Sequence, residues 1–96
     1  MIRHTVAFRL KYPKGSKEEA AFLSAAKKLA AIPGVQKFEV LRQVSPKNEY
    51  AFGLSMEFAD SQAYDGYNTH PDHVAFLRDH WVPDVVAFLE TDYAPI

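Results

Sequence analysis

The regular alternation of residues 50–58 constrains the fold of this chain more than any other feature. In YAFGLSMEF, large apolar side chains occupy every second position, and small or polar ones fill the positions between them. Successive side chains of a strand point to opposite faces, so this spacing predicts a half-buried β-strand. Residues 2–10 alternate in the same way, and 35–44 and 85–93 are also predicted as strands. In 35–44, we expect Phe38, Val40 and Val44 to share one face.

Helical spacing fills the gap between the first two strands. Apolar residues recur every three or four positions from Ala20 to Ala30. Ser16 is placed to cap this helix, and Glu19 follows at the spacing of a capping box. The proline and glycine of IPG at 32–34 predict its end.

A second helix is predicted between the third and fourth strands. Asp60 or Ser61 can cap its start, and it runs to Tyr67. His70-Pro71 then restarts the helix, because proline is favoured at a first helical position, where its missing N–H costs nothing. This part continues to about Trp81, and Pro83 is expected to end it.

The resulting order, β-α-β-β-α-β, predicts an α+β fold of the ferredoxin-like type. Two helices would cover one face of an antiparallel sheet. With 96 residues, the expected organisation is one domain over 1–96. A domain of this size buries a modest core, so help from a partner subunit would be unsurprising.

Composition excludes several classes of function. The net charge is −1 with no basic face, which argues against nucleic-acid binding. The absence of cysteine removes disulfides, thiolate nucleophiles and zinc–cysteine sites. No signal pattern and no apolar run of about 20 residues is present, so we expect a cytoplasmic protein with no membrane partner. No metal or cofactor is expected, because His73 and His80 lack a third ligand and no glycine-rich phosphate loop occurs.

Two histidines stand out as candidate functional residues. His4 is the only polar side chain on the apolar face of residues 2–10, and a buried polar group needs a hydrogen-bond partner. His73 lies one turn into the second helix, near Leu77 and Trp81, which must face the sheet. We therefore expect both histidines in one pocket between sheet and helices, with His73 or a tyrosine as the partner of His4. Imidazoles beside an apolar pocket suit proton transfer near neutral pH, although a pair that only satisfies itself is the alternative.

Three segments carry a resemblance to a known family. IRHTVAFRLK, IPGVQKFEVLRQVSP and YNTHPDHVAF resemble the first strand, the second-strand segment and the His-Pro-x-His signature of the stress-responsive dimeric α/β-barrel (Dabb) domains. The resemblance covers nearly all of the chain. It implies a ferredoxin-like protomer and a homodimer in which two sheets join into one closed α/β barrel. The second sheet face would then line a shared interior, with Arg9, Ala51, Gly53, Ser55 and Glu57.

The same family includes plant polyketide cyclases of the olivetolic acid type, which catalyse an intramolecular aldol condensation. The resemblance assigns catalytic roles to positions that match His4, Tyr67 and His73, without metal or cofactor. These cyclases carry a further tyrosine in the first helix, where this chain has Ala25. Ferredoxin-like dimeric barrels also include cofactor-free monooxygenases, so the fold does not choose the reaction.

Three hypotheses about function follow. The chain binds a small apolar or aromatic molecule, with Phe8, His70, Leu77 and Trp81 as binding residues. Alternatively, it is a cofactor-independent enzyme of cyclase, lyase or monooxygenase type that uses His4, Tyr67 and His73. In the third hypothesis it is a structural or assembly protein whose histidines only satisfy one another. A pocket with room for a ligand favours the first two, and a filled interior favours the third.

Overall fold

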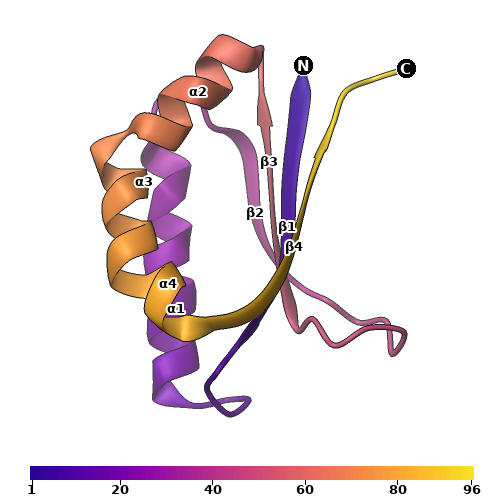
Figure 1. Cartoon of the computed structure of the whole chain (residues 1–96), viewed down its shortest axis with the longest axis vertical. Coiled ribbons are helices and arrows are strands. Elements are labelled where there is room, and N and C mark those ends of the chain that lie inside the picture. The colour runs from indigo at the N-terminus through magenta and orange to yellow at the C-terminus, as the bar shows by residue number, and fades with distance from the viewer.

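The computed structural model describes residues 1–96 and contains one four-stranded antiparallel sheet with its helices on one side (Figure 1). The strand order is β2-β3-β1-β4, which places the first and the last strand of the chain side by side. This arrangement confirms the predicted ferredoxin-like β-α-β-β-α-β protomer. The strands are β1 Ile2–Leu10, β2 Gln36–Arg42, β3 Phe52–Phe58 and β4 Val85–Tyr93.

The helices begin where the sequence places their caps. The Ser16 hydroxyl accepts a hydrogen bond from the Glu19 N–H at 3.2 Å, and the Asp60 carboxylate accepts one from the Ala63 N–H at 2.8 Å. Each cap satisfies an N–H that has no partner within its helix. The helical segments are α1 Lys17–Lys27, the 3-10 segment η1 Lys28–Ala31, α2 Ser61–Thr69, α3 Pro71–Phe76, the π-helical segment η2 Leu77–Trp81 and α4 Val82–Asp84.

The expectation that Pro83 ends the last helix is wrong. The helix widens to π-helical geometry over Leu77–Trp81 and continues to Asp84, so Pro83 lies inside its final segment. Proline lacks the N–H that would bond a carbonyl of the preceding turn. That turn is already π-helical, with the Val82 N–H donating to the carbonyl oxygen of Leu77. The fourth strand then starts directly at Val85.

The second strand is shorter than predicted. It spans Gln36–Arg42, and its pairing with β3 shifts register between Gln36 and Glu39. Lys37 lies in this irregular stretch with φ +49°, as is typical of a β-bulge that breaks the alternation. Val44, expected on the apolar face, lies beyond the strand and is 86% exposed.

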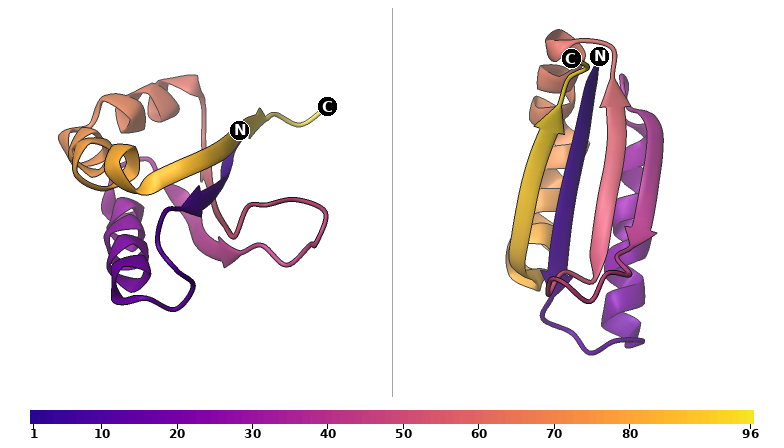
Figure 2. Two further views of the ribbon diagram at one scale, coloured as in Figure 1. Left: turned by 60° about the horizontal axis from the view of Figure 1, so that its bottom comes forward. Right: turned by 90° about the vertical axis from the view of Figure 1, so that its right-hand side faces the viewer.

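Helices pack against only one of the two faces of the sheet. The helices pack on the face that carries Val6, Phe8 and Leu10, and this is the hydrophobic core. No helix covers the other face, which Figure 2 (right) shows from the front. On this uncovered face, Glu57 is buried under Arg3, whose guanidinium lies 2.6 Å from its carboxylate. None of the helices is long and apolar enough to cross a membrane.

Candidate functional site

A pocket of about 340 Å³ opens between the sheet and the helices. Of its 13 lining residues, 9 are hydrophobic, and the polar ones gather at the end formed by β1, β4 and α2. A mostly apolar hollow with a few convergent polar groups is the usual form of a small-molecule site. Its lining residues are His4, Val6, Leu29, Leu54, Tyr67, Asn68, His73, Phe76, Leu77, Trp81, Val82, Phe88 and Glu90.

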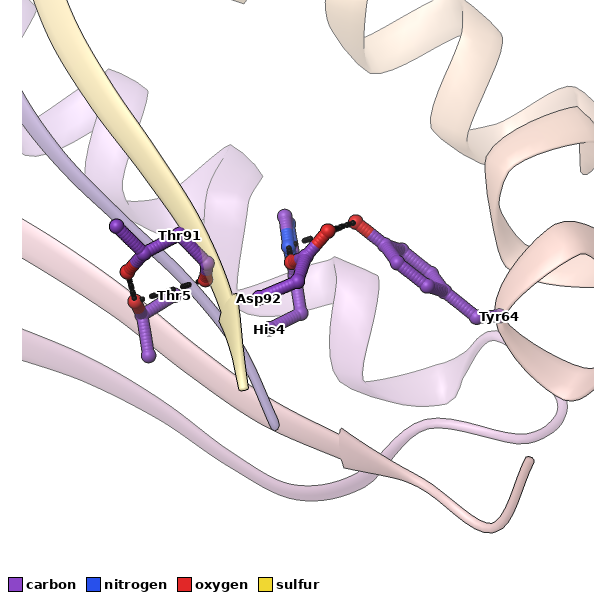
Figure 3. Close-up of polar contacts among 5 residues, drawn as sticks. All are labelled: His4, Thr5, Tyr64, Thr91 and Asp92. Carbon is purple, nitrogen blue, oxygen red and sulfur yellow. Dashed lines mark hydrogen bonds and ion pairs between the residues drawn. The ribbon is translucent and has the colours of Figure 1, made fainter. Parts of the chain in front are cut away.

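The Nδ1 atom of His4 contacts a carboxylate and a phenol. Its ring is almost fully buried, and its Nδ1 lies 2.6 Å from Asp92 Oδ1. The Tyr64 hydroxyl lies 2.9 Å from the same Nδ1 and donates to Asp92 Oδ2, also at 2.9 Å. Figure 3 shows Asp92 between the imidazole and the phenol. Because a carboxylate only accepts, Nδ1 carries the hydrogen, and the neutral ring has an unprotonated Nε2.

His73 has the same tautomer for a different reason. Its Nδ1 lies 3.0 Å from the carbonyl oxygen of Asn68, which can only accept, so Nδ1 donates. Burial lowers the pKa of His73, which favours the neutral ring at neutral pH. The neutral ring therefore has a lone pair on Nε2. Its ring centroid lies 4.3 Å from that of Tyr67.

Tyr67 brings an unpaired hydroxyl to this end of the pocket. The residue is 2% exposed, and its hydroxyl makes no hydrogen bond within the chain. Since no sealed side-chain oxygen or nitrogen lacks a partner, this hydroxyl borders open pocket space. Burial raises the pKa of Tyr67, so the O–H group stays intact at neutral pH and can donate a hydrogen bond.

The structure brings together most of the residues singled out from the sequence. His4, Tyr67, His73, Leu77 and Trp81 all line the pocket. Two expected binding residues lie elsewhere.

Phe8 is fully buried in the core, where its ring packs against Phe22 at 5.5 Å, and it does not reach the pocket. His70 caps α3, because its Nδ1 accepts the N–H of Asp72 at 3.1 Å. The prediction that a helix restarts at His70-Pro71 is therefore confirmed.

Sequence reasoning missed two residues near the polar end, Asp92 and Glu90. The partners of His4 are Asp92 and Tyr64, so of the two expected candidates a tyrosine is confirmed and His73 is wrong. Glu90 lies beside them on β4. The signal was present in the alternation of Phe88, Glu90 and Asp92, which places all three on one face of a strand. The sequence pattern does not show that Asp92 lies beside His4. This follows from the register of β1 with β4, in which the two residues are paired.

One cluster in this region has the spacing of a metal site. Donor atoms of His4, Glu90 and Asp92 lie within 4.8 Å of one another. Asp92 and the Nδ1 of His4 are already engaged with each other, so a metal bound through these atoms would have to displace that hydrogen bond.

Comparisons with known proteins agree with this fold. The model of the stress responsive A/B barrel domain (Dabb) matches residues 2–94. A Dabb family protein with a ferredoxin-like fold from Mesorhizobium loti is 64% identical, covers 99% of this chain and 96% of its own, and has a TM-score of 0.97. A dimeric protein of unknown function from Bacteroides fragilis is 25% identical, with 96% and 93% covered and a TM-score of 0.74. The hydroxynitrile lyase of Passiflora edulis is similar in fold at 15% identity, with 96% and 90% covered and a TM-score of 0.84. No curated protein matches the sequence.

Proposed function

The chain belongs to the stress responsive A/B barrel domain family, and from this premise we propose that it binds a small apolar or aromatic molecule in the pocket between sheet and helices. One observation carries the proposal. A hollow of about 340 Å³ with apolar walls ends at the His4 ring, the Tyr67 hydroxyl and the His73 ring. Such a space is large enough for a small organic molecule, and unpaired polar atoms at one end would orient it. A purely structural role would favour a filled interior.

Binding can be tested through Trp81, the single tryptophan of the chain, which lines the pocket. The probes are acetophenone and 2-octanone, one aromatic and one aliphatic ketone. We expect each to shift the indole N–H resonance of Trp81 in NMR titrations.

The matched variants are Leu77→Phe, in the pocket wall, and Leu23→Phe, at a half-buried helix position outside it. Leu77→Phe should weaken binding about tenfold by overfilling the space, and Leu23→Phe should not. Absence of any shift at millimolar probe, or equal affinity in both variants, would sink the proposal.

A second candidate function is proton transfer without a cofactor, and the orientation of the imidazoles favours it. Asp92 behind His4 would stabilise the imidazolium that forms when Nε2 takes a proton from a carbon next to a carbonyl. The intact Tyr67 O–H can donate to the oxyanion that develops on the carbonyl oxygen. His73 Nε2 offers a second acceptor beside Tyr67. A positioned base typically contributes about 10²–10⁴-fold in rate.

This candidate can be tested before any natural substrate is known. Exchange of the acetophenone methyl hydrogens for deuterium in D₂O, followed by NMR, reports removal of the α-proton directly. We expect the protein to accelerate exchange, and His4→Gln and Tyr67→Phe each to reduce the rate by about 10²-fold or more. The two losses should be non-additive if the groups act together. His80→Gln, outside the pocket, is the control. Exchange no faster than in buffer would remove the enzymatic candidate and leave the binding role standing.

We also propose that the protein is a homodimer joined through the uncovered sheet face. That face exposes the large apolar residues Leu41, Leu89 and Tyr93, each at least 44% exposed. A contiguous exposed apolar surface on a small domain favours association. The similar protein of Bacteroides fragilis is itself dimeric. Sedimentation velocity at micromolar concentration should give a dimer, and Leu89→Arg should shift it to monomer. A monomeric wild-type protein would contradict the proposal.

A further inference from the structure

The polar end of the pocket is negatively charged. Glu90 is its only lining carboxylate, and no lysine or arginine lines it. Asp92 lies next to Glu90, with donor atoms of both within 4.8 Å of His4. None of the six ion pairs of the chain involves Glu90. Glu90 and Asp92 are both solvent-exposed, so water and salt screen their charges in part, but their shared sign attracts cations and repels anions at this end.

Two buried side chains at this end have polar atoms without a partner. His4 and Tyr67 are both more than nine-tenths buried, and neither the His4 Nε2 nor the Tyr67 hydroxyl has a partner in the chain. Nε2 of the neutral imidazole is an acceptor, and the phenol oxygen can also accept. An ammonium group, with three donors and no acceptor, can use all of these lone pairs and the Glu90 carboxylate. A ligand carboxylate would find one donor, the Tyr67 O–H, beside the like charge of Glu90.

The walls beyond this end suit an apolar body attached to the cation. Trp81 and Phe88 meet edge to face, with their ring centroids 5.6 Å apart, and both line the pocket. Aromatic faces attract a nearby ammonium as well as hydrocarbon, through the ring quadrupole.

A metal ion would fit this end less well. Both oxygens of Asp92 already accept hydrogen bonds, from His4 Nδ1 and from Tyr64. A metal bound to these donors would break those contacts, while an ammonium can use Glu90 and the remaining lone pairs and leave them intact.

We propose that the pocket takes a hydrophobic amine, with its ammonium group at Glu90, His4 and Tyr67 and its apolar body against Trp81 and Phe88. The inference rests on the proposed binding function, and it narrows the ligand class. It predicts rejection of carboxylates and phosphates of the same shape.

The test uses three probes that differ only at the head group. These are 2-(1-naphthyl)ethylamine, 2-(1-naphthyl)ethanol and 1-naphthylacetate, titrated by NMR at neutral pH and low salt. We expect the amine to bind tightest, the alcohol next, and the carboxylate at least about tenfold more weakly than the amine. Glu90→Gln should remove most of the advantage of the amine over the alcohol. Glu18→Gln, which deletes an exposed charge on α1, should preserve it.

The outcomes separate this inference from the binding proposal. If the three probes bind equally, or the amine keeps its advantage in Glu90→Gln, the amine inference is overturned and the binding pocket stands. If none binds at millimolar concentration, both are overturned. If Zn²⁺ or Mn²⁺ alone binds stoichiometrically at His4, Glu90 and Asp92 and displaces the amine, the cluster is a metal site and the amine inference fails.

Discussion

The layer between sheet and helices has two halves that differ in how they are filled. In one half, aromatic rings pack against one another: Phe8 lies 5.5 Å from Phe22 and 5.7 Å from Phe52, measured between ring centroids. In the other half, His4, Tyr67 and His73 surround open space, and their free polar atoms face no protein partner. The same sheet face supports both halves. The layer therefore has one side that is filled by packed rings and one side that leaves room for the proposed ligand.

The packed half should be far more sensitive to truncation than the hollow half. Phe22 is 1% exposed, and Phe22→Ala leaves a cavity that its neighbours cannot close. We expect a loss of about 3–5 kcal/mol in the free energy of unfolding, measured by denaturant titration at fixed protein concentration. The neighbouring Leu23→Ala, at a half-buried position, should cost clearly less. A loss of less than about 1 kcal/mol for Phe22→Ala would contradict the division into two halves.

Asp92 should affect both the stability of the fold and the shape of the pocket, because it hydrogen-bonds His4, whose ring lines the pocket. Asp92→Ala removes the main acceptor of a buried imidazole N–H, leaving only the Tyr64 oxygen. We expect a loss of about 1–2 kcal/mol on unfolding, reduced by the partial exposure of Asp92. Asp92→Asn retains a carbonyl acceptor, so it should cost less. Equal stability of the Asp92→Ala variant and the wild type would show that His4 does not depend on this contact.

The burial of His73 should appear in the pH dependence of stability. Its pKa in the folded protein is lowered, mainly by burial, below the unfolded value of about 6.5. The unfolded chain therefore binds more protons between these two values, and the free energy of unfolding falls as the pH drops through that window. His73→Gln should flatten this part of the profile. An unchanged slope between wild type and His73→Gln would show that His73 is not buried in its neutral form.

The smallest effect on stability is expected at the Tyr67 hydroxyl. Tyr67→Phe removes an oxygen that has no hydrogen-bond partner in the chain and keeps the packed ring. The free energy of unfolding should change by no more than about 0.5 kcal/mol, although binding of a polar ligand head group should weaken. A loss above about 1.5 kcal/mol would reveal a structural partner for this hydroxyl.

The order of strands and helices could be predicted from local patterns, because caps and period-two alternation are written in neighbouring residues. Ser16 and Asp60 cap their helices as the sequence indicates. The bulge at Lys37 and the continuation of the helix past Pro83 were missed, because both depend on how the segment packs rather than on its own residues.

For the site, periodicity places His4 and His73 on the faces that meet. The role of Asp92 could not be predicted in this way, because the alignment of β1 with β4 is set by tertiary pairing. Phe8 and His70 are the two expected binding residues that do not line the pocket. Packing assigns one of them to the core and the other to a helix cap.

The tautomers of the two histidines test the central claim most directly, namely that both rings carry their proton on Nδ1 and leave Nε2 free in the pocket. Long-range ¹H–¹⁵N correlation spectra at about pH 8, where an ordinary imidazole is neutral, distinguish the two ring nitrogens. We predict protonated Nδ1 and unprotonated Nε2 for both His4 and His73, and a change at both Nε2 atoms when 2-(1-naphthyl)ethanol is added. A proton on Nε2 of His4, or no response of either ring to the probe, would contradict the proposal that this pocket is the functional site.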